Sequence, residues 1–175
     1  MHSRFRRIAV ALVLTIAATG VGTAEESEHF VKSRDIPSEY KSVAEFLDYL
    51  KPAKQPRSGF DISIAPQWDL DRLMSFISDK GLTMSDVNQA AAKVQQLSPK
   101  QIRSAVAARK GQPFQMLVHL GYIYAQPYKQ YSELRFEPRL TGVVVHMASW
   151  YRMTFDLPDG QPKLARLDYL MREGH

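Results

Sequence analysis

Histidine is the residue type in this chain best suited to acid–base or metal chemistry. Of the five histidines, His119 lies in a long apolar segment and His146 directly follows the run Val143–Val145. The two could meet in the fold to bind a metal ion or to shuttle a proton. A metal site needs a third ligand, and no His-x-x-x-His or His-Glu-x-x-His spacing supplies one. We therefore predict a hydrogen-bonded core histidine at each position, with no metal-binding and no catalytic role.

Paired carboxylates do not add a catalytic centre. Asp69 and Asp71 precede an apolar helical pattern, where acidic residues stabilise a helix start. Glu133 and Glu137 stand among arginines, which is typical of a solvated charged surface. The chain also has no cysteine, no nucleophile elbow, no phosphate-binding loop and no dinucleotide fingerprint. The sequence thus predicts neither an enzyme nor a bound cofactor, although a non-catalytic subunit of an enzyme complex is compatible with it.

The first 24 residues are typical of a secretory signal peptide. Three arginines form a basic head, residues 8–18 are almost wholly apolar, and the small residues up to Ala24 fit a cleavage site. The apolar run is shorter than the ~20 residues of a membrane span, so an uncleaved anchor is the less favoured alternative. We expect a mature chain from Glu25 in the periplasm or outside the cell, with no disulfide and no cysteine to carry a lipid.

The net charge of +5 overstates how basic the exported protein is. Three of the 23 basic residues lie in the signal peptide, and the others nearly balance the 18 acidic residues. A nucleic-acid binder needs a clustered basic surface, so we exclude that class. The mature length fits one domain whose core is large enough to be stable without disulfides.

The predicted domain organisation is an arm followed by a core. Residues 25–67 should form an N-terminal arm with one short helix, capped by Ser42, and a proline-rich linker. Residues 68–175 should form the globular α+β core. Within the core, apolar spacing and capping residues predict short helical hairpins over residues 69–80, 83–97 and 99–109.

Two further patterns complete the predicted fold. A nearly all-apolar segment from Pro113, which includes Leu117 and Val118, predicts a buried helix. After it, alternating residues on both sides of the turn at 158–160 predict a C-terminal antiparallel β-hairpin. A helix over residues 163–172 is the rival, because the leucines there also fit helical spacing. The position of the turn favours the strand.

Aromatic residues give the positive indication of function. Tyrosine and tryptophan are enriched at protein interfaces, because their rings are apolar while their polar atoms need partners. The proline-stiffened arm and the tyrosine-rich end of the buried helix should therefore form a partner surface. The predicted partner-binding residues are Phe60, Ile62, Ile64, Trp68, Tyr122, Tyr124, Tyr128 and Tyr131.

The favoured hypothesis is an exported, non-catalytic accessory subunit. It would bind and stabilise a larger periplasmic or membrane-bound protein, for example in a respiratory dehydrogenase complex, and would contact the membrane only through that partner. An inhibitor or an immunity protein fits the same class. One alternative is a periplasmic carrier of a lipid or quinone, with a pocket lined by Trp150, Tyr151, Met153 and Phe155. Another is a small hydrolase that uses His119 or His146.

Overall fold

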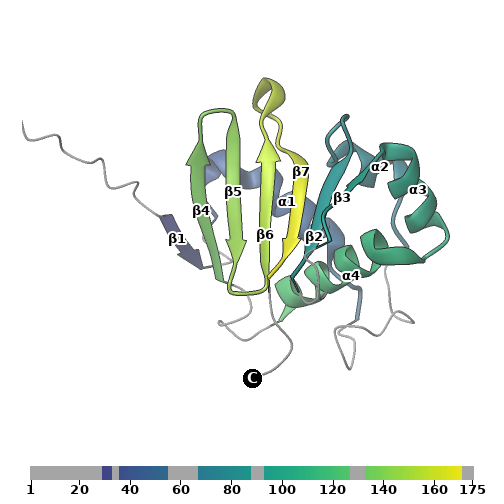
Figure 1. The fold of residues 1–175 in the computed structure, drawn as a ribbon. Coiled ribbons are helices and arrows are strands. Elements are labelled where there is room, and N and C mark those ends of the chain that lie inside the picture. The colour runs from purple at the N-terminus through teal and green to yellow at the C-terminus, as the bar shows by residue number, and fades with distance from the viewer. Residues whose placement is uncertain (1–28, 33–35, 55–66, 88–92, 127–132, 171–175) are drawn as a thin grey trace, which may run out of the picture.

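The fold is an α+β arrangement built on one mixed β-sheet (Figure 1). The computed structural model describes residues 29–32, 36–54, 67–87, 93–126 and 133–170. In these ranges the sheet has the strand order β1-β4-β5-β6-β7-β2-β3. Only the β7–β2 pair is parallel among the described strands. The strands are β1 (His29–Lys32), β2 (Leu82–Asp86), β3 (Gln95–Leu97), β4 (Glu133–Arg139), β5 (Gly142–Met147), β6 (Tyr151–Asp156) and β7 (Lys163–Tyr169).

The helices cover one face of the sheet. Figure 1 shows α1 behind the central strands, whereas no labelled helix covers the face turned toward the viewer. α1 packs against α4, and α3 packs against both α2 and α4. The helices are α1 (Lys41–Leu50), α2 (Leu70–Ser75), α3 (Pro99–Ala107) and α4 (Gly111–Ala125), with 3-10 turns η1 (Ser38–Tyr40) and η3 (Pro158–Gly160).

α4 is the central helix of the core, as its all-apolar sequence predicts. Leu117 is fully buried and Val118 nearly so. The same core includes Phe46 and Leu47 of α1 and the inward-facing side chains of the sheet. α1, the short helix that was expected within the N-terminal arm, therefore packs in the same core as α4 and the sheet.

Local sequence signals locate two other elements correctly. Ser98 caps α3 through a capping box with Gln101, and Pro99 occupies the first turn. The C-terminal hairpin is confirmed: β6 pairs with β7 in antiparallel register, with Met153 opposite Leu167. Residues 163–169 are therefore a strand, and the rival helix is wrong.

The helix predicted over residues 83–97 is wrong. Its two ends are strands β2 and β3, which pair with each other in antiparallel register. β2 also lies parallel to β7, with Met84 opposite Leu167. Leu82 and Met84 are buried on either side of the partly exposed Thr83, and that alternation is the strand periodicity. Pairing with a strand that is distant in sequence outweighs the local helical spacing.

Two helix boundaries also differ from the prediction. The helix expected over residues 69–80 ends at Ser75, because Ile77 bridges to Leu164 and the Ser78 amide donates to the Leu164 carbonyl. α1 begins at Lys41 after η1, so Ser42 lies inside the helix and is not its N-cap. Across the described ranges, no helix has the length and apolarity needed to cross a bilayer.

Candidate functional site

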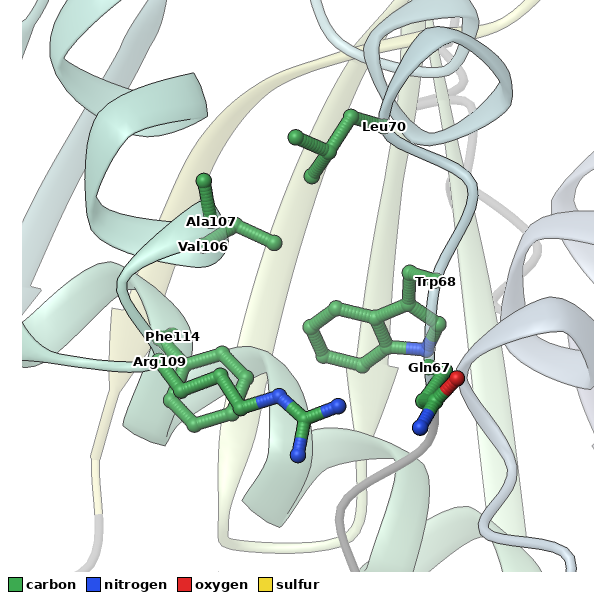
Figure 2. Close-up of a pocket in the computed structure, with 7 residues that line it drawn as sticks. All are labelled: Gln67, Trp68, Leu70, Val106, Ala107, Arg109 and Phe114. Atoms are coloured by element: carbon green, nitrogen blue, oxygen red, sulfur yellow. The ribbon is translucent and has the colours of Figure 1, made fainter.

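A pocket of about 410 Å³ opens beside the start of α2. One wall consists of Gln67, Trp68 and Leu70 (Figure 2). The opposite wall comes from the end of α3 and the first turn of α4. Its residues are Val106, Ala107, Arg109 and Phe114. The pocket thus joins two parts of the chain that lie about 40 residues apart in sequence.

Trp68 is held in place by the residue that follows it. Asp69 is the N-cap of α2, and its carboxylate accepts hydrogen bonds from the amides of Asp71 (2.9 Å) and Arg72 (3.2 Å). The Tyr49 hydroxyl donates to the Asp69 carbonyl at 2.7 Å, which ties this turn to α1. The Trp68 ring then packs edge-on against Phe114, with ring centroids 5.8 Å apart. Trp68 is therefore fixed at one side and open to the pocket at the other.

The opposite wall is shaped by the tight turn between α3 and α4. Arg109 has a positive φ of 49°, and the Lys110 amide donates to the Ala105 carbonyl at 3.0 Å. Arg109 is exposed, and Figure 2 shows its guanidinium directed across the pocket toward the Gln67 side. An ion pair of 2.8 Å between Arg103 and Asp71 links α3 to α2, although exposed pairs of this kind contribute little to stability.

The indole N–H of Trp68 is buried and has no acceptor among the residues that the structure describes. A buried donor without an acceptor costs about 1–3 kcal/mol. Most buried polar atoms in folded proteins avoid that cost by forming a hydrogen bond. The residue that carries this donor lines the pocket, so a bound group that brought an acceptor to the indole nitrogen would gain stability.

The other predicted partner-binding residues are not gathered at this pocket. Tyr124 is buried, and burial together with the nearby Asp48 charge raises its pKa to about 12. Tyr122 is half-buried and lies beside the His119 ring. Both are near the C-terminal end of α4, about 12 Å or more along the helix from Phe114. Phe60, Ile62, Ile64, Tyr128 and Tyr131 lie outside the described residues.

His119 is a hydrogen-bonded core histidine, as predicted. Its ring is buried on α4, and Nδ1 shares a 2.8 Å hydrogen bond with the Tyr151 hydroxyl. Burial lowers the pKa of His119 to about 4, so the ring is neutral near pH 7. Tyr151, Met153 and Phe155, which the carrier hypothesis placed around a ligand, are all core residues.

His146 is not a core histidine, and the prediction for it is wrong. On β5, Val145 and Met147 face the core, so the alternation of the strand turns His146 to the face of the sheet opposite the helices. Its Nε2 lies 3.1 Å from Glu137 Oε2, and Glu137 also forms an ion pair with Arg139. The hydrogen bond from His146 is the largest effect on the Glu137 carboxyl, whose pKa is lowered. In the described part of the chain no serine or threonine hydroxyl is hydrogen-bonded to His146.

The face of the sheet opposite the helices also carries a buried carboxylate that the sequence did not single out. Asp168 on β7 is fully buried and forms ion pairs with Arg152 of β6 and Arg166 of β7, and the Ser85 hydroxyl of β2 donates to it. Burial by itself raises the pKa of Asp168, but the hydrogen bonds from Arg166, Ser85 and Arg152 outweigh it, so the pKa is lowered. The register that brings Ser85 and Arg152 opposite Asp168 depends on long-range strand pairing.

Comparisons with protein-family models, curated proteins and solved structures find no match for this chain. Within the described ranges no group of three or more histidine or acidic side chains is placed to hold a metal ion. The Trp68 pocket and the charged face of the sheet are two places on the described surface that are hollowed and lined by side chains able to bind a partner or a ligand.

Proposed function

We propose that this chain is an exported, non-catalytic accessory subunit, and that its larger periplasmic or membrane-bound partner docks at the Trp68 pocket. The observation that carries the proposal is the buried Trp68 N–H, which has no acceptor among the described residues. A backbone carbonyl or a polar side chain of the partner would accept this hydrogen bond. Binding would then remove an energetic cost that the isolated subunit bears.

The chemistry of the pocket walls supports an inserted side chain with a polar end. Leu70, Val106 and Phe114 offer an apolar surface, while Arg109 places a guanidinium at the rim. Tryptophan and arginine are the residue types that most often dominate binding energy at protein interfaces. A partner side chain that fits this combination has an apolar stem and ends in a hydrogen-bond acceptor.

The test uses Trp68→Phe beside Trp68→Ala. Phenylalanine keeps an aromatic ring against Phe114 but removes the N–H, so we expect partner binding to weaken by about 0.5–1.5 kcal/mol. The isolated variant should unfold at the same denaturant concentration as the wild type or a higher one, since an unsatisfied donor has gone. Trp68→Ala should weaken binding by ~2 kcal/mol or more.

The measurement is co-purification from the native envelope fraction in mild detergent, followed by titration of the identified partner. Lys110→Gln is the matched control, because Lys110 is an exposed cation beside Arg109 that does not line the pocket. Normal partner binding by both Trp68 variants would show that the partner docks elsewhere. Unfolding of both isolated variants would show that Trp68 serves the core and not an interface.

A carrier of a small apolar ligand is the second candidate for the same pocket. Its volume lies in the range of roughly 300–1,000 Å³ that is usual for small-molecule sites, and five of its seven lining residues are apolar, although its exposed lining is about equally polar and apolar. A carrier would hold its ligand after purification. Extraction of native protein with organic solvent and mass spectrometry would find one lipid or quinone per chain, reduced in Trp68→Ala, and no partner protein.

A further inference from the structure

The face of the sheet opposite the helices presents two arginines that are held in a fixed geometry. Arg152 Nε and Nη2 both lie 3.0 Å from Asp168 Oδ2. Arg166 Nε lies 2.9 Å from both carboxylate oxygens, and its Nη2 lies 2.9 Å from Oδ1. Because Asp168 is completely buried beneath them, the two guanidinium groups are anchored from below.

Each anchored guanidinium still has donors to offer. A guanidinium has five N–H donors, and each of these arginines uses Nε and Nη2 on Asp168. In the described part of the chain, neither Nη1 group has a hydrogen-bond partner. The side chains are 43% and 37% exposed, and both arginines line a hollow on this face.

The charge of this cluster favours an anion. Two guanidinium cations share one ionised carboxylate, which leaves a single positive charge at the surface. Ordering a long side chain on binding normally costs free energy, and that cost is reduced here because Asp168 has already ordered both arginines. Forked arginine donors match the geometry of carboxylate and phosphate oxygens.

The two arginines line a hollow of about 550 Å³, which is larger than a bare oxyanion needs. Thr154 lies opposite Arg166 in the strand register and two residues after Arg152 on β6, and it adds a hydroxyl to the lining. Two carboxylates also line the hollow. Glu137 is already paired with Arg139 and His146. Lys163 lies opposite Asp156 in the strand register, but its ammonium donates to the Ser75 carbonyl, so Asp156 keeps its negative charge and repels an anion from its side of the hollow. The anionic end of a ligand is therefore directed to Arg152 and Arg166.

We infer that this hollow binds a small organic ligand through a terminal oxyanion, which Arg152 and Arg166 hold while the rest of the ligand occupies the space toward Thr154 and His146. The inference does not depend on partner binding at the Trp68 pocket, because the two sites have no lining residue in common. The chemistry recognised is that of a phosphate or a carboxylate group.

The experiment is a nuclear magnetic resonance titration of the folded protein with inorganic phosphate and, separately, with acetate, at constant ionic strength. We expect saturable shifts of the Nε–H signals of Arg152 and Arg166, while Arg103 on α3 stays unchanged. Arg166→Lys keeps a positive charge beside Asp168 but loses the fork, and it should weaken binding of the oxyanion at least about tenfold. Arg103→Lys is the matched control.

Saturation by phosphate alone would identify a phosphate-bearing ligand, and saturation by acetate alone a carboxylate. Three results would overturn the inference. They are linear shifts that do not saturate with either anion, equal shifts at Arg103, and unchanged affinity in a folded Arg166→Lys variant. The wild-type titration answers the question directly even if Arg166→Lys fails to fold.

Discussion

Gly121→Ala is expected to destabilise the protein by about 3 kcal/mol, at the upper end of the usual cost of overpacking. A Cβ at this position would lie 2.1 Å from the Leu50 carbonyl oxygen and 2.7 Å from its carbon. Both atoms belong to the backbone, so no side-chain rotation relieves the clash. α1 and α4 would have to separate, and the buried contacts between them would be lost.

The sign of this effect makes the measurement decisive. Gly121 lies in the interior of α4, where helix propensity alone predicts that alanine gains roughly 0.5–1 kcal/mol. Urea unfolding of the purified variant measures the difference. Gln115→Ala, on the exposed side of the same helix, is the control and should be nearly neutral. An equal or raised free energy of unfolding for Gly121→Ala would contradict the close approach of the two helices.

The elements that were predicted correctly are those with strong local signals. α4 is apolar on nearly all sides, α3 begins with Ser98-Pro99, and the turn at 158–160 separates two alternating segments. β2 gave a misleading signal, because Thr83 and Ser85 resemble helix caps when the segment is read alone. Its strand conformation depends on pairing with β7, more than 80 residues later.

The candidate sites were less predictable than the fold. Trp68 was identified from its residue type, but the pocket also needs Phe114 and Arg109, which only the packing of α3 against both α2 and α4 brings near it. Glu133 and Glu137 were recognised as part of a charged surface. The strand alternation of β4, with Leu134 and Phe136 buried, was missed because Pro138 and the charges dominate that segment.

The core and the charged face of the sheet are connected through the ladder between β6 and β7. Tyr151 lies opposite Tyr169, and the next pair along the ladder is Arg152 opposite Asp168. Successive side chains on a strand point to opposite faces, so the tyrosines face α4 while Arg152 and Asp168 face outward. His119 contacts both tyrosines, with ring centroids 5.6 Å away in each case. Packing around His119 therefore fixes the strand positions that hold the Arg152–Asp168 pair.

Acidification from pH 6.5 to 4 is expected to remove about 3 kcal/mol of stability through His119 alone. The pKa of His119 is about 4 in the folded protein, against 6.5 for an ordinary histidine. Above pH 6.5 the ring is neutral in both states and the full stability is present. Below pH 6.5 the histidine is protonated in the unfolded chain but stays neutral in the folded one. The free energy of unfolding therefore falls until the pH reaches about 4. Each unit of pKa difference between the folded and the unfolded state corresponds to about 1.4 kcal/mol of stability.

His119→Gln isolates this contribution, because glutamine keeps a polar group for the Tyr151 hydroxyl but does not titrate. The free energy of unfolding of the variant should depend much less on pH between 6.5 and 4. The difference in stability between the wild type and the variant should therefore shrink as the pH falls. His146→Gln, at the partly exposed histidine on the other face, is the matched control and should retain most of the wild-type fall. If His119→Gln keeps the wild-type pH dependence and His146→Gln loses it, His119 is not the buried neutral group of the core. The aromatic cluster would then have to be hydrated enough to accept a charged ring.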